Sequence, residues 1–444
     1  MAAPALTERR SLPVLPIPPR RIARAARLRR HWGLGVLLAG AVALRVLALV
    51  AIYPGIWFSD TNDYVREAVT GTLSPVRVGG YALFVAPFWN LGSAGALIVV
   101  QHVLGLAIVV AVYALLVHRG APRWVACLAA APAALDLYLV DIEHMIMSET
   151  VFHVALVAAF VLLLWRERPG PAAAAAAGLA LGYAAVVRSV AMPFVALVAL
   201  YLVARHAGRR ALPAFAVGWL LVVGGYAAIY DAQHGHLGFS DYGGRFLYGQ
   251  VAPFADCSRL TDLPPDEALL CPDPALHLNR TLLMWGSRSP LHGQPLRADG
   301  RIGDFAKRVI RAQPGDFASL VATSFIHYLE PGHHTTGNDY PVSAWQFPAD
   351  PRVYHYPAYR GPIRPGSRHR LRGSDPGPLI TRLVRRGPRL DVAVSRDLHY
   401  AQRYLSVSGE VFVPCLAIVA LALVLRRGSR RLRLDAALLA ACAL

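Results

Sequence analysis

The sequence predicts an all-α polytopic membrane protein that carries a mixed, irregular domain outside the membrane. Hydrophobic residues make up 55% of its 444 residues. The mean hydropathy is +0.41, a value that a soluble domain covered by polar groups does not reach. Apolar segments recur along the chain and are separated by short basic stretches. The formal net charge of +18 comes from arginines that cluster at the ends of these segments, where orientation in the membrane and lipid phosphates explain them. Membrane lipids are therefore expected as partners, and nucleic acid is not.

About nine segments are expected to cross the membrane, although several are near the short end of the usual range. In chain order they are Trp32–Tyr53, Ala94–Val117, Trp124–Val140, Val151–Trp165, Ala172–Val187, Val190–Ala204, Leu212–Tyr230, Val411–Leu425 and a shorter end at Leu434–Leu444. The apolar run Val78–Trp89 is too short and interrupted to cross, and we expect it to dip into the outer leaflet.

Arginine distribution predicts the orientation. The basic loops 118–123, 166–168, 205–210 and 426–433 fall on the same side as the arginine-rich residues 1–31, and the positive-inside rule makes that side cytoplasmic. The chain is thus expected to be a multi-pass protein of the cell membrane with a cytoplasmic N-terminus, and its tail is too long and arginine-rich for a signal peptide. The predicted organisation is a tail at 1–31, a membrane module at 32–230 with a first outer loop at 54–93, an extracytoplasmic domain at 231–407 and C-terminal membrane segments at 408–444.

The first outer loop contains the most informative stretch, Phe58–Tyr64. A helix from Thr61 places Asp60, Asp63, Tyr64 and Glu67 along one face. Acidic side chains beside the hydrocarbon core are energetically unfavourable, and those that occur there usually have a functional role. The alternative is helix capping, with Ser59 or Asp60 as N-cap and Asp63 in the first turn. Glu67 lies further along the helix and is expected to meet water.

Further polar residues interrupt the apolar segments. Arg188 splits one of them at the predicted outer face, where it either binds an anion or decorates a helix end. Ser148 and Glu149 open another, as cap and first-turn acid or as lining of an outer cavity. The arginine series Arg352–Arg396 is either a solvated loop or a surface for an anionic glycan or lipid headgroup.

Histidines and cysteines occur in the predicted outer domain. His333 and His334, with Glu330 and Asp339 nearby, are too close in sequence to complete a metal site by themselves. No metal or other cofactor is therefore expected, although a divalent cation is compatible with the sequence. Cys257 and Cys271 predict a disulfide, because both lie in the part of the chain assigned to an oxidising compartment.

The order of several motifs resembles a known family. They are Arg45 in the first apolar segment, Pro54, Ser59-Asp60-x-x-Asp63-Tyr64, the Gly-Gly-Tyr-Ala-Leu-Phe run at Gly79–Phe84, and the later stretches Met147–Phe152 and Gly178–Arg188. This order is similar to that of the C-type (GT-C), polyprenyl-phosphate-dependent glycosyltransferases, which include the protein O-mannosyltransferases and the lipid A aminoarabinose transferases. The resemblance covers the membrane part to about Ala204 and does not extend to the outer domain.

The resemblance implies a multi-pass glycosyltransferase of the cell envelope that moves a sugar from a polyprenyl-phosphate carrier to a glycan, lipid or protein acceptor. Asp60 then corresponds to the catalytic aspartate and Tyr64 to the family's tyrosine. The sequence departs from the pattern where Arg77–Gly80, rather than prolines, precedes Tyr81. The second acid of the loop is also shifted, which leaves the role of Asp63 open.

The chemistry is consistent with these residue types. A lipid monophosphate is an anionic leaving group that arginines stabilise without a divalent ion, and Arg45, Arg77 and Arg188 are the candidates. A carboxylate near the acceptor hydroxyl serves as general base, and a single base predicts inversion at the anomeric carbon. Asp60 and Asp63 are the catalytic candidates, and the candidate substrate-binding residues are Tyr64, Arg77, Tyr81, Glu149, Arg188 and Arg45.

Two other classes of protein also fit this composition. A lipid or polysaccharide transporter or flippase has many crossings and buried charges, but such charges usually lie at mid-membrane. Here the charges, apart from Arg45 and Asp136, are expected near an interface. A non-catalytic assembly protein of the cell envelope would use its outer domain for binding. Transfer of sugar from a lipid-phosphate donor separates the enzyme from both alternatives.

Overall fold

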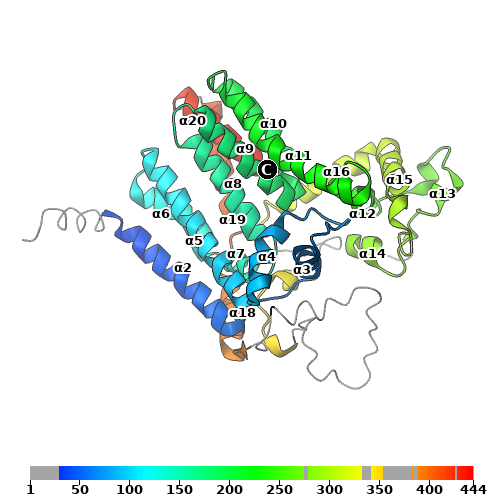
Figure 1. Ribbon diagram of the computed structural model, residues 1–444, viewed down its shortest axis with the longest axis horizontal. Coiled ribbons are helices and arrows are strands. Elements are labelled where there is room, and N and C mark those ends of the chain that lie inside the picture. Colours follow the sequence, from blue (N-terminus) through cyan, green and yellow to red (C-terminus); the bar gives the residue numbers. More distant parts are fainter. Residues whose placement is uncertain are drawn as a thin grey trace, which may run out of the picture.

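The structure is a computed structural model, and it describes residues 30–274, 279–332, 342–353, 383, 389–425 and 428–443. Nearly all of its regular structure is helical. The two strands, β1 (Ile52–Tyr53) and β2 (Arg389–Leu390), pair antiparallel, with Ile52 opposite Leu390. The predicted all-α class is therefore correct for the part of the chain that is described (Figure 1).

Among the described residues, ten helices form the main bundle, and their bounds follow. They are α2 (Trp32–Ala51), α5 (Ala94–His118), α6 (Arg123–Leu135), α7 (Leu137–His144), α8 (Glu149–Leu164), α9 (Pro171–Val187), α10 (Phe194–Ala204), α11 (Ala211–His234), α19 (Gly409–Val424) and α20 (Arg430–Ala443).

The remaining elements are shorter or more polar. They are α3 (Thr61–Thr70), α4 (Gly80–Leu91), α12 (Gly243–Val251), α13 (Pro265–Ala268), α14 (Arg280–Trp285), α15 (Asp299–Ala312), α16 (Pro314–His327), α18 (Val392–Gln402) and the 3₁₀ turns η1 (Ser189–Ala191), η2 (Cys257–Arg259), η4 (Leu296–Ala298), η5 (Val342–Trp345) and η6 (Pro351–Val353). Helix α4 occupies the run that was expected to dip into the membrane.

Within the described residues, three helices are long and apolar enough to span a membrane, namely α2, α5 and α11. The pair α6 and α7, bent by 47°, would make a fourth span, and α8, α9, η1 with α10, and α19 are shorter apolar helices. The length and composition of these helices are consistent with a membrane protein. They do not by themselves establish the nine crossings expected from the sequence.

The segment Trp124–Val140, expected as one crossing, is broken at Asp136. The backbone of Asp136 is extended (φ −66°, ψ 112°), and its carboxylate accepts a hydrogen bond of 2.8 Å from the backbone N–H of Tyr138. This side chain therefore caps a new helix, α7, instead of continuing the old one. Asp141 (0% exposed) and Glu143 (6%) are buried on α7.

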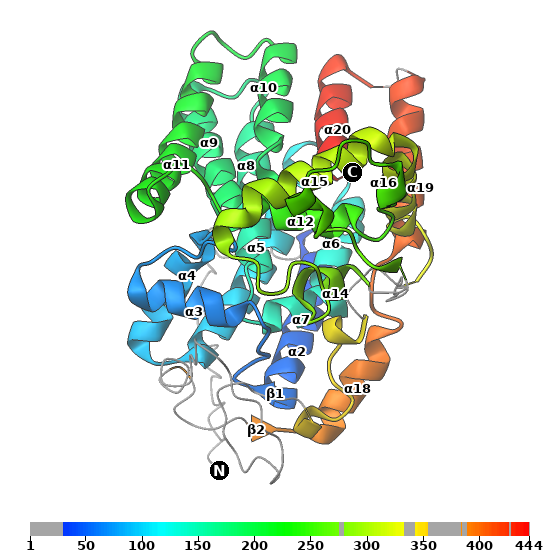
Figure 2. The same ribbon diagram turned by 90° about the vertical axis from the view of Figure 1, so that its right-hand side faces the viewer.

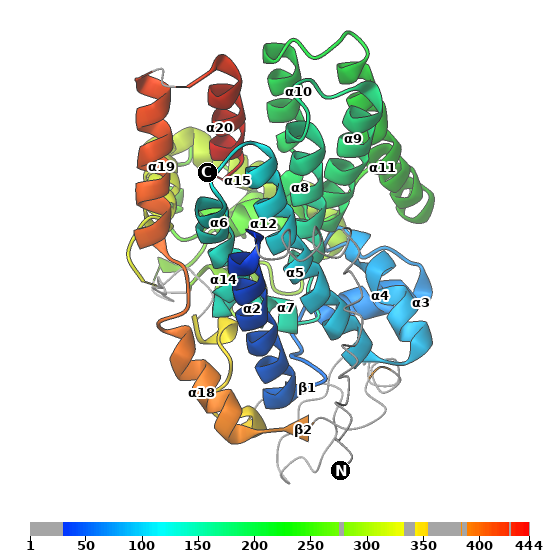
Figure 3. The same cartoon turned by 90° about the vertical axis from the view of Figure 1, so that its left-hand side faces the viewer.

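The arginine-rich turns lie together at one end of the bundle. Arg119, after α5, and Tyr201, on α10, both contact Asp435 of α20, the tyrosine at 2.7 Å. Arg431 of α20 is 2.8 Å from Glu167, which follows α8. Figures 2 and 3 show the α8–α9 and α10–α11 turns, with the neighbouring ends of α19 and α20, at the end opposite β1 and α3. The basic loops thus share one end of the molecule, and the assignment of that end to the cytoplasm stays a prediction.

Two hydrophobic cores hold the outer elements. The larger core joins α2, α3, α4, α7, α8, α9 and α11, and it also includes Phe347 and Leu398. A smaller core lies between α12, α14 and α15, around Tyr248 and Phe305. Residues 231–407 therefore contribute to two cores, since α18 packs on α2 and α7 rather than on α15.

Candidate functional site

Asp60 lies immediately before α3, yet its side chain makes no capping hydrogen bond. It forms an ion pair with Arg77 instead, and the two side chains are 24% and 23% exposed. Asp63 contacts the same guanidinium at 3.5 Å and Arg66 at 2.6 Å. Arg77 is therefore held between two carboxylates, at the start of the helix that the sequence placed there, and capping does not explain the side chain of Asp60.

Tyr64 connects α3 to the start of α8. Its hydroxyl donates a hydrogen bond of 3.1 Å to Oγ of Ser148, and its ring meets the ring of Tyr81 edge-on at 4.8 Å. The Arg77 guanidinium lies 6.0 Å from the centre of the Tyr64 ring. Burial is the largest influence on Tyr64 and raises the pKa of its hydroxyl, so this phenol stays protonated and acts as a donor.

The second acid–arginine pair is Glu149 with Arg188. Glu149 opens α8 and Arg188 ends α9, and their side chains are 13% and 40% exposed. Ser148 makes no capping hydrogen bond with its side chain, and Oε2 of Glu149 is buried without a hydrogen-bond partner among the described residues. A carboxylate in this state has one oxygen available to a ligand.

Close packing of α4 against the end of α9 brings the two pairs into one region. A Cβ atom on Gly80 would lie 2.5 Å from the carbonyl oxygen of Val186, so a larger residue has no room there. The Tyr183 hydroxyl donates to the carbonyl of Gly80 at 3.3 Å. The tight contact at Gly80 thus sets the distance between the Arg77 segment and Arg188.

Arg45 is not part of this region. Its guanidinium is buried and donates to both carboxylate oxygens of Glu143, at 2.8 and 2.7 Å. Glu143 is also 3.0 Å from Nδ1 of His102, and Nε2 of His102 is 3.1 Å from His144. The sequence predicted Arg45 as a ligand of the donor phosphate. In the structure its guanidinium instead donates hydrogen bonds to Glu143 and to the backbone carbonyls of Ala41 and Ala134.

Gln101 joins this buried polar group to the aromatic residues of the site. The amide of Gln101 donates to the carbonyls of Glu143 and Met145, at 2.8 and 2.7 Å, and accepts from the Tyr81 hydroxyl at 2.5 Å. Sequence reasoning did not single out Gln101, His102 or His144. The available signal was the pair of polar residues at 101 and 102 inside an otherwise apolar helix, which is costly in a membrane.

Glu67 is buried, with 3% of its surface exposed, so the expectation that it meets water is wrong. One carboxylate oxygen accepts a hydrogen bond of 2.6 Å from the backbone N–H of Ser74, and the other has no partner among the described residues. Burial raises the pKa of Glu67 to about 7. The physical reason is that the loop 71–79 folds back over α3, which a helical-face argument does not predict.

Other predicted features fall in different places. Cys257 and Cys271 form a disulfide beside the smaller core. No group of three potential metal ligands exists among the described residues, and His333, His334 and Asp339 lie outside them. In the arginine series, Arg352 pairs with Asp350 at 2.7 Å, while residues 354–382 are outside the described part of the chain.

The fold and this region together are those of a helical protein with apolar helices that could cross a membrane and with two acid–arginine pairs, where the loop 54–93 meets the start of α8 and the end of α9. Comparison of the chain with protein-family models, with curated proteins and with solved structures found no match in any of the three. The function is therefore argued from the site alone.

Proposed function

We propose that the protein is a membrane glycosyltransferase that moves a sugar from a polyprenyl-phosphate carrier to an acceptor hydroxyl at the outer face. The observation that carries this proposal is the position of Asp60: a helix-start aspartate that does not cap its helix and shares an arginine with Asp63. The nearby Glu149–Arg188 pair supplies a second cation. These groups are a base and two anion ligands, which is the set that transfer from a lipid phosphate requires.

In the proposed reaction the acceptor oxygen attacks the anomeric carbon and its proton passes to the Asp60 carboxylate. The bond between the anomeric carbon and the phosphate oxygen breaks, and the lipid phosphate leaves with the electron pair. Arg77 and Arg188 stabilise the negative charge that develops on that phosphate. Attack from the face opposite the leaving group inverts the anomeric carbon.

The ion pairs suggest how donor binding prepares the base. Arg77 is engaged by Asp60 and Asp63 in the structure, and the singly charged phosphodiester of the donor competes for the same guanidinium. When Arg77 turns to the donor phosphate, the carboxylate of Asp60 is released toward the acceptor. Arg188 exchanges Glu149 for phosphate in the same way.

The test is sugar transfer by the purified protein from a synthetic lipid-phosphate sugar. Asp60→Asn keeps the shape but removes the basicity, and the rate should fall by roughly a hundred- to ten-thousand-fold. Asp63→Asn is the matched control, because it removes one carboxylate from the same arginine. A folded Asp60→Asn protein that keeps most of its transfer rate would refute the assignment and move the base to Asp63 or Glu149.

A transporter or flippase is the second candidate, and a specific observation favours it. Arg45, Glu143, His102 and His144 form a buried polar group, and Asp141 is buried with both carboxylate oxygens unpaired among the described residues. Buried ionisable groups of this kind are typical of transport pathways. In vesicles that contain the protein, movement of a labelled polyprenyl-phosphate sugar from one leaflet to the other, without any transfer product, would favour this candidate over the enzyme.

A further inference from the structure

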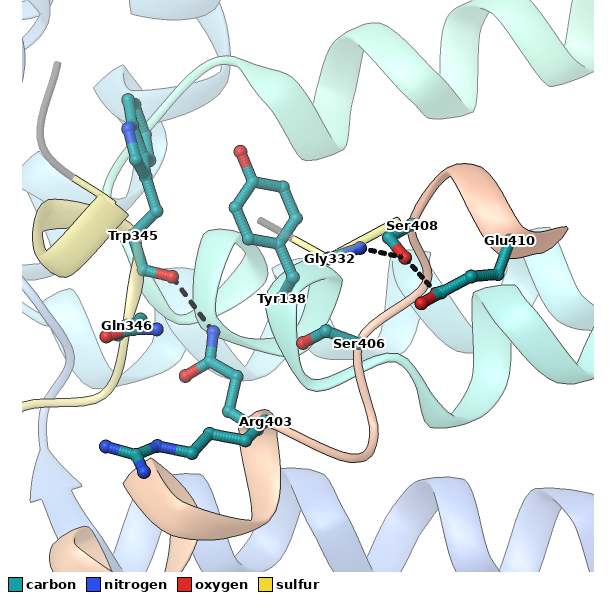
Figure 4. A pocket seen from close by; sticks show the side chains of 9 residues that line it. Tyr138, Gly332, Trp345, Gln346, Arg403, Ser406, Ser408 and Glu410 are labelled. Atoms are coloured by element: carbon teal, nitrogen blue, oxygen red, sulfur yellow. Dashed lines mark hydrogen bonds between the residues drawn. The ribbon is translucent and has the colours of Figure 1, made fainter. Parts of the chain in front are cut away.

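A polar cavity separate from the acid–arginine pairs lies between α7, η5, α18 and the start of α19. Its volume is about 240 Å³. Among the described residues its walls are formed by Tyr138, Gly332, Trp345, Gln346, Gln402, Arg403, Ser406, Ser408 and Glu410 (Figure 4). None of these residues was assigned a role above.

Two aromatic side chains and a set of neutral polar groups face each other in this cavity. Figure 4 shows the Tyr138 ring standing between Trp345 on one side and Ser408 with Glu410 on the other. Gln402 holds the wall in place, because its amide donates to the carbonyl of Trp345 at 2.9 Å and accepts from the N–H of Phe347 at 3.0 Å. The aromatic wall is thus fixed by hydrogen bonds rather than by packing alone.

One polar atom in the cavity wall has no partner. Oγ of Ser406 is buried and makes no hydrogen bond within the described residues. A buried hydroxyl is normally satisfied by protein, water or ligand, so a water or ligand in the cavity would supply the partner that this one lacks among the described residues.

The charges of the cavity select a neutral ligand over an anion. Arg403 and Glu410 contribute one charge of each sign, and the carboxylate of Glu410 accepts a hydrogen bond from Ser408. The remaining polar groups are hydroxyls and amides, which donate and accept with equal ease.

We propose that this cavity binds one neutral sugar ring of the acceptor. A pyranose ring presents a C–H face, which suits the negative face of an aromatic ring, and a hydroxyl edge, which suits Ser406 and Gln346. The volume is below the roughly 300–1,000 Å³ of sites for drug-sized ligands, so it suits a single ring rather than an oligosaccharide.

The cavity is joined to the loop that carries the proposed base. The ring of Trp345 stacks on Phe58 with ring centres 5.0 Å apart, and Phe58 precedes Asp60 by two residues. A sugar held against Trp345 therefore lies beside the loop whose aspartate would take its proton. This assignment of the acceptor rests on the proposed transferase function.

Sugar binding can be measured without any donor. The purified protein, in a detergent that has no sugar headgroup, is titrated with methyl glycosides of glucose, galactose, mannose and arabinose, and saturation-transfer NMR detects the bound ligand. We expect at least one of them to bind saturably, and inorganic phosphate not to displace it. Ser406→Ala combined with Gln346→Ala should weaken binding by about tenfold, because two hydrogen bonds are lost. Ser319→Ala, an exposed serine on α16, is the matched control and should leave binding unchanged.

Three outcomes would overturn the assignment: no saturable binding of any glycoside, binding that the double variant does not weaken, or displacement by phosphate. The two proposals fail separately. A protein that binds a glycoside in this cavity but transfers no sugar refutes the transferase reaction, and with it the acceptor role, but leaves sugar binding by the cavity standing. A protein that transfers sugar but binds no glycoside refutes the cavity assignment.

Discussion

Replacing Glu67 by glutamine should remove a pH dependence from the stability of the folded protein. Burial raises the pKa of Glu67 from 4.5 to about 7 in the folded state, while in the unfolded chain the group returns to its ordinary value. Between these values the folded state holds a proton that the unfolded state releases. Stability from this group is therefore present at low pH and is lost as the pH rises from about 4.5 to 7.

The size of the effect follows from the shift. A difference of roughly 2.5 pKa units corresponds to about 3 kcal/mol. For a chain of 444 residues this amounts to about 3 °C in the thermal midpoint, on the entropy per residue typical of globular proteins. Glutamine resembles the protonated acid and can still accept the hydrogen bond from Ser74, so the variant should lack this contribution.

The measurement is the thermal midpoint of wild type and Glu67→Gln in detergent at several pH values between 4.5 and 8. The difference between the two proteins matters, because other groups titrate in both. We expect the wild type to lose about 3 °C relative to the variant as the pH rises through this range. Parallel curves would show that Glu67 is ionised in the folded protein and that its burial does not govern its charge.

Three further predictions concern the donor site, the smaller core and the orientation of the protein in the membrane. Arg188→Ala should raise the KM for the lipid-phosphate donor by at least about tenfold, because a charge-assisted hydrogen bond is lost. Arg188→Lys should retain part of the affinity. An unchanged KM in the alanine variant would show that Arg188 only ends a helix and does not bind the donor. Replacing Cys257 and Cys271 by alanine should lower the free energy of unfolding of the smaller core by about 3 kcal/mol, as expected for a loop of 14 residues. Protease digestion under non-reducing conditions measures this loss. Two free thiols in the purified wild type would contradict the pairing. A cysteine at the exposed Gly300 should react with an impermeant thiol reagent in intact cells, whereas one at Gly208 should react only after permeabilisation; the reverse pattern would invert the predicted orientation.

The positions of most apolar helices could be predicted from the sequence, because a long apolar run favours a buried helix whichever neighbours it packs against. The start of α3 at Thr61 and the end of α9 at Val187, directly before Arg188, also agree with expectation. The break at Asp136 was missed, since the apolar run continues through it. A single aspartate that caps the next helix interrupts the backbone, while the average hydropathy of the whole segment stays high enough for a crossing.

The pairing of charges could not be predicted from the sequence. Arg77 was a candidate for binding phosphate, but nothing in its neighbourhood in the chain indicates Asp60 and Asp63 as its partners. The burial of Glu67 depends on the return of loop 71–79, and the engagement of Arg45 depends on Glu143, which is far away in the chain. Such contacts arise when segments distant in sequence pack together, and local periodicity does not encode them.

The contact between α2 and the β2–α18 segment has a consequence for how the protein is made. The carbonyl of Ala51 accepts a hydrogen bond of 2.9 Å from the backbone N–H of Asp391, and Ile52 pairs with Leu390. Helix α2 therefore leaves the ribosome long before its partner at residues 389–391 is synthesised. Until then the C-terminal end of α2 has unpaired backbone groups, and closing so large a loop is slow. We expect nascent chains arrested before residue 389 to be bound by membrane chaperones and to be cut by proteases near residue 52.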